Sequence, residues 1–440
     1  MIPRLYLFLA LATASILVPF SQAQDAEPYE LPPINYSKTN PHDVITHLEA
    51  ELISGQSKLE GTGREVVQSL LRMLHIPVTS QMLVFSKTSF QKDLIGPERP
   101  RALFYTDNCY VGWVPGGLVE IAAIDPELGP VFYSFDPRGL SAKKTAEFSR
   151  EDDCLRCHGG IYVRGIPAVF SRSLYADKNG ELMLREGSEV VDYKTPFSER
   201  WGGWYVTGGH GATLHRGNVI ANEIDNRLVF DAKRGANISN LSSFFDTRDY
   251  LTNSSDIVSL LVFEHQTAVQ NALTRAGFNC RHMLDYQNSL QAALQPTPTS
   301  DPDGLSFDSV RGVFDHSAED VVDALLFKDE APLPKNITGS AAFQKDFSAA
   351  VPRARNGDSF KDLLVSEHLF KNRCSYLIYS DSFLSLPRQL KCRIYTRLSK
   401  ALDLEQPDPR YAYIGRAERQ RIATILQATN PEFSNQPASK

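Results

Sequence analysis

Residues 102–135 read ALFYTDNCYVGWVPGGLVEIAAIDPELGPVFYSF, and this stretch decides the fold class of the 440-residue chain. It is rich in β-branched and aromatic residues, and the segment DPELGP within it is typical of a turn. We therefore expect strands on both sides of that turn, over 118–124 and 131–135, and a further strand run over 102–114. A similar run at 82–86 is expected to join them in a small antiparallel sheet.

Helical periodicity flanks this sheet region on both sides. Apolar residues recur at helical spacing over 42–74 and again over 256–276. For the second segment Ser254 or Ser255 is a plausible N-cap, and Gly277 is the expected stop. The C-terminal part is mainly helical as well. The sequence thus predicts an α+β protein, mainly α, with a small N-terminal antiparallel sheet region, a central loop and helix core, and a helical C-terminal part.

Composition excludes several classes of protein. The chain is 42% hydrophobic and 22% charged, which is ordinary for globular proteins and unlike collagen, coiled coils or disordered chains. It carries 46 basic against 52 acidic side chains, a net charge of −6. No basic stripe stands out that could neutralise phosphates, so nucleic acid is not expected as a partner.

The N-terminus has the pattern of an export signal. Residues 1–23 hold one arginine, an apolar run from Leu5 to Phe20 and a small residue, Ala23, at the expected cleavage point. A membrane anchor is the alternative, but a spanning helix needs about 20 apolar residues, and Pro19 interrupts this run. We expect a periplasmic or secreted protein, with no transmembrane segment in the mature chain.

The strongest motif is DCLRCHG at 153–159, which contains the C-x-x-C-H spacing of c-type haem attachment. In such sites Cys154 and Cys157 would each bond one vinyl group of the porphyrin, and His158 would become an axial ligand of the iron. Export agrees with this hypothesis, because c-type haem is attached outside the cytoplasm. The motif predicts one covalently bound haem c.

Three other uses of this cysteine pair stay open. Exported cysteines often form structural disulfides. A dithiol redox centre usually has an aromatic residue before its first cysteine, where this chain has Asp152 and Asp153. A zinc site needs a second ligand pair at standard spacing, and His210 with His215 lies too far along the chain to supply it.

The sixth position of the iron needs a separate candidate. Met183 and Met283 do not have the spacing of the methionine ligand in small class I cytochromes, so histidine is preferred. His265 is the first choice, because apolar residues four positions before and after it place it on the apolar side of a helix. His210 is the runner-up, since its glycine-rich loop could approach a flat ligand closely. Either histidine could instead be a structural residue that is satisfied by hydrogen bonds.

The remaining cysteines are Cys109, Cys280, Cys374 and Cys392, and their spacing selects no particular pairing.

The motif is accompanied by five other distinctive runs: YVGWVPGG (110–117), VEIAAIDPELG (119–129), RWGGWYVTGGHG (200–211), EHQ (264–266) and CSYLIYS (374–380). With them the chain resembles a set of large exported bacterial proteins that carry a single C-x-x-C-H motif and are named cytochrome c domain-containing proteins. The resemblance covers nearly the whole mature chain. It implies haem on Cys154 and Cys157 with His158 as axial ligand, and it brings no established substrate or distal ligand.

These observations predict an organisation and a function. The expected parts are a signal peptide (1–23), an extended arm (24–41), an α+β haem-binding region (42–294), a linker (295–312) and a helical C-terminal region packed on the core (313–440). The expected function is that of an exported monohaem c-type cytochrome that carries electrons in the periplasm to or from an unidentified redox protein. Two alternatives are a haem-dependent oxidoreductase, peroxidase-like, with an open distal site, and a non-redox scaffold with a C-x-x-C disulfide.

Overall fold

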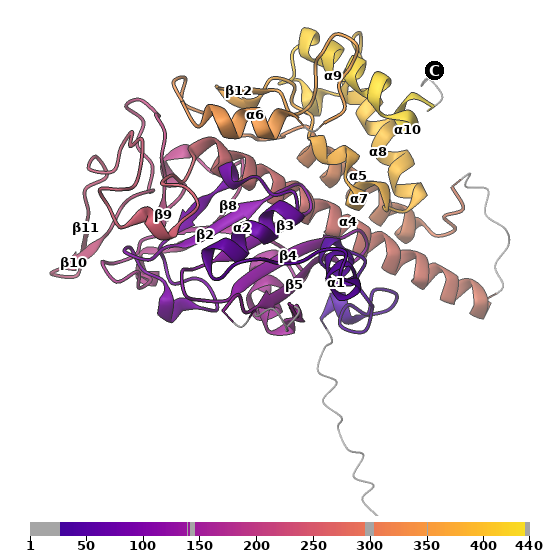
Figure 1. The fold of residues 1–440 in the computed structure, drawn as a ribbon. Helices are drawn as coiled ribbons and strands as arrows, with labels where there is room; N and C mark the ends of the chain where they lie inside the picture. Colours follow the sequence, from indigo (N-terminus) through magenta and orange to yellow (C-terminus); the bar gives the residue numbers. More distant parts are fainter. Residues whose placement is uncertain (1–26, 139, 141–145, 295–302, 350, 436–440) are drawn as a thin grey trace, which may run out of the picture.

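The computed structural model describes residues 27–138, 140, 146–294, 303–349 and 351–435. These residues form an α+β fold in which a seven-stranded antiparallel sheet is followed by a largely helical C-terminal part (Figure 1). The predicted fold class is confirmed at this level.

The sheet is larger than the four strand runs predicted. Its strand order is β6-β5-β4-β3-β2-β1-β9. The run predicted over 102–114 is in fact two strands joined by a tight turn. At the next turn, Asp125 Oδ1 accepts hydrogen bonds from the backbone nitrogens of Glu127 and Leu128, both at 2.7 Å. The strands are β1 (Met82–Val84), β2 (Arg101–Tyr105), β3 (Cys109–Trp113), β4 (Val119–Asp125), β5 (Gly129–Phe135), β6 (Ser149–Arg150) and β9 (Trp204–Tyr205).

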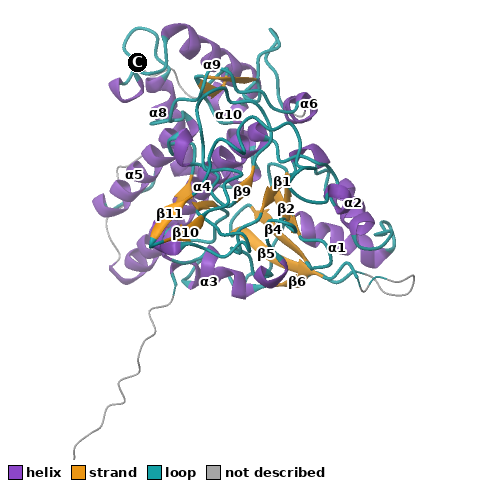
Figure 2. Ribbon diagram, turned by 90° about the vertical axis from the view of Figure 1, so that its left-hand side faces the viewer, coloured by secondary structure: helices purple, strands orange, loops and turns teal. Residues whose placement is uncertain are grey.

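Different helices cover the two faces of the sheet, which lies between them in Figure 2. The flanking helices are α1 (Val44–Ser54), α2 (Arg64–Met73) and α4 (Ile257–Leu294). On the α1 and α2 side, the Tyr133 hydroxyl donates a hydrogen bond to Asp43 Oδ2 at 2.6 Å. On the α4 side, the Tyr105 hydroxyl donates to the Ser259 carbonyl at 2.8 Å. Side chains alternate between the two faces along a strand, and all five residues of β3 are buried, so both faces of the sheet are covered.

Helix α4 continues through Gly277, so the predicted stop is wrong. A glycine inside a helix costs about 1 kcal/mol relative to alanine, and tertiary packing outweighs this cost. Phe278 and Cys280, which follow the glycine, are buried in the core. A Cβ at position 277 would lie 3.5 Å from Leu386 Cδ2 and 2.7 Å from the Arg281 guanidinium, so the glycine leaves room for these neighbours.

Asp256 lies directly before helix α4 and caps it, in place of Ser254 or Ser255, the expected N-caps. Its Oδ1 accepts hydrogen bonds from the backbone nitrogens of Val258 and Ser259, and its Oδ2 accepts one from Ser340 at 2.5 Å. This buried carboxylate therefore ties the helix to the C-terminal part.

We expect Asp256→Ala to lower the free energy of unfolding by about 2 kcal/mol, because it removes a helix cap and leaves buried N–H groups unpaired. Urea unfolding followed by far-UV circular dichroism measures the effect. The control is Asp246→Ala, which removes the cap of an exposed 3₁₀ turn at Thr247–Asp249 and should cost less than about 1 kcal/mol. Equal losses in the two variants would contradict this role of Asp256.

The C-terminal part is built mainly from helices. Helix α5 lies against both α4 and α8. It begins at Asp308, inside the predicted linker, and residues 295–302 of that linker lie outside the described residues. The C-terminal elements are α5 (Asp308–Leu325), α6 (Ala341–Ala349), β12 (Leu363–Ser366), β13 (His368–Phe370), α7 (Asp381–Leu384), α8 (Arg388–Ala401), α9 (Arg416–Thr429) and α10 (Pro431–Ser434). Two further hairpins precede α4: β7 (Ser171–Leu174) with β8 (Ser188–Val191), and β10 (Asn222–Ile224) with β11 (Arg227–Val229).

The segment predicted as an extended arm is folded onto the sheet where it is described, from residue 27. It forms a 3₁₀ turn at Pro28–Glu30 and buries Tyr29, Ile34 and Tyr36. The Tyr36 hydroxyl donates to the Pro130 carbonyl at 2.8 Å. Burial of these apolar side chains explains why the segment does not extend into solvent.

The predicted signal peptide, residues 1–23, lies outside the described residues. Among the helices of the described ranges, none has both the length and the apolar character required to span a membrane.

Candidate functional site

The C-x-x-C-H motif forms a short helix directly after the edge strand β6. A 3₁₀ turn at Asp152–Cys154 continues into α3 (Leu155–His158). Cys154, Cys157 and His158 are related by i, i+3 and i+4 spacing, which places the three side chains on one side of a helix. Both cysteines are free thiols; Cys154 is half-buried and Cys157 is exposed. The helix thus presents two accessible thiols beside an imidazole.

His158 is held in one orientation and one tautomer. Its Nδ1 lies 2.8 Å from the Ala168 carbonyl oxygen, and the Ala168 nitrogen donates to the His158 carbonyl at 2.8 Å. The imidazole packs between Phe132 and Phe170, with ring centroids 4.9 and 5.1 Å away. A carbonyl only accepts hydrogen bonds, so Nδ1 carries the proton and Nε2 carries the lone pair. Burial lowers the pKa of His158, which favours this neutral form.

The Nε2 atom of His158 has no hydrogen-bond partner among the described residues. A histidine that ligates a metal through one nitrogen commonly donates its other N–H to a backbone carbonyl or a carboxylate. The contact with Ala168 is of this kind, so His158 is prepared to ligate through Nε2.

An ion pair on the sheet lies close to the motif. Arg101 Nη2 is 2.5 Å from Glu120 Oε2, and both charges act on Cys154 and His158. Burial, with a further contribution from Glu120, raises the pKa of the Cys154 thiol to about 11. The Arg101 guanidinium lies over β3 in a space that a Cβ at position 112 would fill, so Gly112 makes room for it.

Arg101 also carries an unused donor. Its Nε is buried without a hydrogen-bond partner among the described residues. A buried N–H that lacks a partner is costly, and a carboxylate such as a haem propionate would satisfy it. The residues around the motif therefore fit a c-type haem. Sequence reasoning missed Arg101, because no local pattern links β2 to the motif.

The structure does not bring His265 to the motif. His265 is fully buried on α4, with Nε2 2.9 Å from Ser375 Oγ, and its ring stacks on Phe327 at a centroid distance of 3.9 Å. Burial lowers its pKa to about 3. None of the residues that contact the His265 ring contacts the ring of His158 in the described part of the chain.

Helix geometry accounts for this separation. Asn271, on the same helix, donates from Nδ2 to the Val169 carbonyl at 2.9 Å and so faces the segment that holds His158. His265 lies six positions earlier, a rotation of about 240° at 3.6 residues per turn. It therefore points to a different side of α4, although its apolar setting was correctly predicted.

His210 is likewise engaged elsewhere. Its Nδ1 lies 2.6 Å from the Thr213 carbonyl oxygen, and its Nε2 accepts a hydrogen bond from the Asn237 nitrogen at 3.0 Å. Its ring packs against His215, with centroids 4.4 Å apart. Both nitrogens are used by the backbone, so the glycine-rich loop contributes a structural histidine in this conformation.

The alternatives for the cysteines can be compared with the same geometry. All six cysteines are free thiols. Within the described ranges, no three His, Cys, Asp or Glu side chains are grouped so that they could hold a metal ion. The disulfide and zinc hypotheses therefore gain no support from this arrangement.

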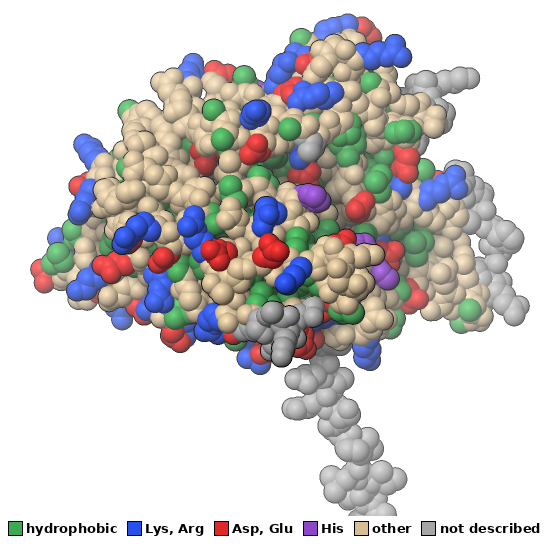
Figure 3. Space-filling view, viewed as in Figure 1, with side chains coloured by type: hydrophobic (Ala, Val, Ile, Leu, Met, Phe, Trp, Pro, Cys, Tyr) green, Lys and Arg blue, Asp and Glu red, His purple; other side chains and the backbone are tan. Residues whose placement is uncertain are grey.

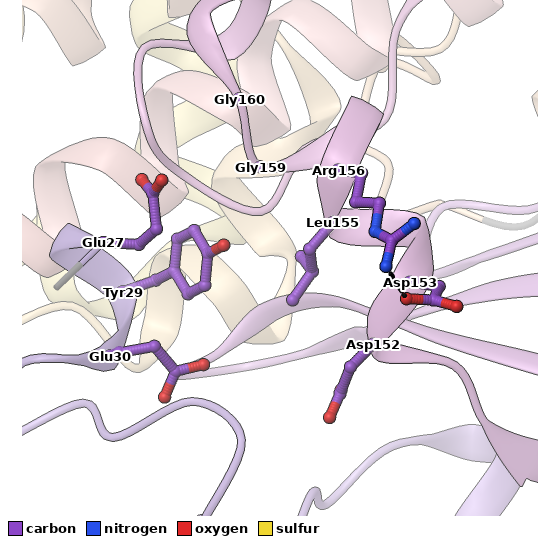
Figure 4. Close-up of a pocket in the computed structure, with 9 residues that line it drawn as sticks. All are labelled: Glu27, Tyr29, Glu30, Asp152, Asp153, Leu155, Arg156, Gly159 and Gly160. Atoms are coloured by element: carbon purple, nitrogen blue, oxygen red, sulfur yellow. Dashed lines mark ion pairs between the residues drawn. The ribbon is translucent and has the colours of Figure 1, made fainter. Parts of the chain in front are cut away.

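A pocket of ≈ 360 Å³ opens on the other side of the motif helix (Figure 4). It is lined by Glu27, Tyr29, Glu30, Asp152, Asp153, Leu155, Arg156, Gly159 and Gly160. In Figure 4 Tyr29 and Leu155 project toward each other from the N-terminal segment and the motif helix. Neither thiol nor His158 lines this pocket, which agrees with their place on the opposite side of the helix.

Charged side chains of both signs share the surface of the molecule. On the face shown in Figure 3, acidic and basic side chains are interspersed, and no continuous basic stripe crosses it.

No protein-family model, curated protein or solved structure matches this chain. The geometry of the motif helix is therefore the basis for assigning a function.

Proposed function

We propose that this protein is an exported monohaem c-type cytochrome that carries electrons in the periplasm, with haem bound to Cys154 and Cys157 and with His158 as axial ligand. The observation that carries the proposal is the state of His158: the Ala168 carbonyl holds Nδ1–H, while Nε2 is left with a free lone pair. When bound, the haem supplies a one-electron redox couple whose potential depends on ligands, hydrogen bonds and burial.

The chain's own residues have distinct parts in this proposal. Phe132 and Phe170 fix the plane of the His158 ring. Arg101 is the residue that we assign to a propionate, because its buried Nε lacks a partner. Phe90 is a large exposed aromatic residue next to Ser89, whose hydroxyl donates to Glu120 at 2.9 Å. It therefore stands at the same corner of the sheet and is suited to cover an apolar porphyrin edge.

The test is a pyridine haemochrome spectrum of protein produced in a host that matures c-type cytochromes. We expect the spectrum of a thioether-linked haem, with one haem per chain that stays on the polypeptide after extraction with acidified organic solvent. Complete release of the haem would refute the proposal. Protein without haem would favour the non-redox scaffold.

A second candidate function is a haem-dependent oxidoreductase with an open distal site. The observation that favours it is that His265 and His210 are both held by other partners, away from the motif. An iron without a second protein ligand can bind a small substrate. Titration of the reduced protein with carbon monoxide distinguishes the candidates, because ready binding indicates an accessible sixth position.

We expect the ferric spectrum to be the same in the wild type, His265→Gln and His210→Gln, because neither side chain contacts the motif. Electronic absorption and electron paramagnetic resonance report the spin state. A low-spin wild type that becomes high-spin only in His265→Gln would contradict this prediction. It would mean that α4 or the motif helix moves when haem binds, and it would favour a closed, electron-carrying iron.

A further inference from the structure

We propose that the acidic pocket behind the motif helix, together with the apolar residues beside it, is the docking surface for a redox protein that inserts a lysine or arginine side chain. This inference rests on the proposed function, because such a partner would exchange electrons with the haem. The pocket is formed where the 3₁₀ turn at Pro28–Glu30 meets the motif helix (Figure 4).

The pocket is lined by a tyrosine whose hydroxyl has no partner in the described part of the chain. Tyr29 as a residue is only 7% exposed, and its hydroxyl, which has no hydrogen bond to any described residue, is open to the pocket that Tyr29 lines. Gly159 allows this close approach, because a Cβ there would lie 3.0 Å from the Tyr29 ring and 3.2 Å from its hydroxyl. A phenol oxygen can accept a hydrogen bond from an ammonium or guanidinium group, and the ring can bind the same cation through its face.

The rim of the pocket selects a cation. It carries four carboxylates, of which Asp153 pairs with Arg156 at 3.1 Å and Asp152 pairs with Arg150 at 3.6 Å. Glu27 and Glu30 have no ion pair with any described residue, and Glu30 Oε2 accepts a hydrogen bond from the Ser37 hydroxyl at 2.8 Å. Burial and then the charges of Glu27 and Glu30 raise the pKa of Tyr29, and in Figure 4 these two side chains lie to either side of the tyrosine.

The surface next to the pocket favours a protein, rather than a small amine, as the binding partner. Ile161, directly after the pocket residue Gly160, is 89% exposed, and Tyr162 is also exposed. Apolar side chains of this size beside a polar rim are typical of protein interfaces. A metal ion is a poor match, since the pocket carboxylates in the described part of the chain are not grouped to chelate one.

The position of the pocket suits electron exchange. Leu155 and Arg156 line it, and they lie between Cys154 and Cys157 in the motif. The pocket and the thiols therefore occupy opposite sides of one helix, whose diameter with side chains is about 10 Å. A partner docked in the pocket would approach the thioether-linked group to about this distance.

The test is a fluorescence anisotropy titration of the haem-loaded protein with a labelled seven-residue peptide of lysine, leucine and alanine. At an ionic strength of about 0.01 M, where the screening length is about 30 Å, we expect saturable binding that weakens with salt. Glu27→Gln combined with Glu30→Gln should weaken it about tenfold, and Ile161→Ser and Tyr29→Phe about threefold each.

The matched control is Glu60→Gln combined with Glu98→Gln, which removes the same charge from exposed sites that do not line the pocket. It should change the affinity by less than about twofold. Equal weakening in the control, or none in the pocket variant, would overturn the proposal. Displacement of the peptide by spermidine with equal affinity would also overturn it, because a small amine would then suffice.

The docking surface and the proposed function can each be refuted without the other. The anisotropy signal comes from the peptide, so it reports on the pocket whether or not the haem is covalent. If protein that lacks covalent haem binds the peptide specifically, the proposed function is refuted but the pocket is still a cation-binding surface. If the haem is covalent but the peptide does not bind specifically, the cytochrome proposal stands and the docking surface is refuted.

Discussion

Replacing Cys154 and Cys157 together by alanine is expected to abolish covalent haem attachment completely. Each thioether bond needs its own thiol, and the two thiols lie on the same side of one helix as His158. The fold should persist, because Cys154 is half-buried and Cys157 is exposed, and substitutions at such positions usually change stability by less than about 1 kcal/mol. The measurements are haem absorbance on the acid-denatured polypeptide and the intact mass, which should be lower by one haem.

Cys392→Ala is the matched control for this loss. Cys392 is a half-buried free thiol on α8, far from the motif in sequence, and its removal should leave one haem per chain. Cys109→Ala should also keep the haem, although it opens a small cavity in β3. Haem retained by the double variant, or lost from Cys392→Ala, would refute attachment at the motif.

The parts of the fold that follow from short-range patterns could be predicted from sequence. The turn at DPELGP is fixed locally, since Asp125 bonds to nitrogens two and three residues ahead. The apolar side of the helix around His265 also follows from spacing alone. The motif itself is a local pattern, so the placement of Cys154, Cys157 and His158 on one side of a helix was predictable as well.

The remaining features depend on contacts between distant segments. Helix α4 passes Gly277 because it packs against Leu386, and no local signal reveals that neighbour. Arg101 reaches the motif only through the pairing of β2, β3 and β4. Periodicity placed His265 in a core but could not show which part of the core it faces. The arm was misjudged because prolines mark irregular backbone, and irregular backbone can still be buried.

A buried ion pair joins the glycine-rich loop to α4, and its loss is expected to have the second large effect, on the free energy of unfolding. Arg200 and Glu264 are 2% and 1% exposed, and Arg200 Nη1 lies 2.8 Å from Glu264 Oε2. Arg200 also donates from Nε to the Thr195 carbonyl and from Nη2 to the Tyr193 carbonyl, at 2.8 and 3.0 Å. The Arg200 side chain thus neutralises the buried Glu264 carboxylate, and it also holds the loop that precedes Arg200 through hydrogen bonds.

We expect Arg200→Met to lower the free energy of unfolding by about 3–5 kcal/mol, because it leaves Glu264 buried without a counter-charge. Urea unfolding measures the loss. The control is Arg248→Met, which breaks an ion pair with Asp246 at an 88% exposed side chain and should cost less than about 1 kcal/mol.

The penalty of Arg200→Met should also depend on pH. Burial, which exceeds the opposing effect of Arg200, raises the pKa of Glu264 to about 7, above its ordinary value of 4.5. The folded state therefore holds this proton more tightly than the unfolded chain, and the contribution of Glu264 to stability falls as the pH rises between these two values. Without Arg200 the folded-state pKa of Glu264 rises further, so the fall in stability continues to higher pH.

The loss of unfolding free energy in Arg200→Met, measured at about pH 5 and about pH 8, should be smaller at the lower pH, where a protonated Glu264 needs no counter-charge. Equal penalties at both values would mean that the arginine acts through its hydrogen bonds to the loop and not through its charge.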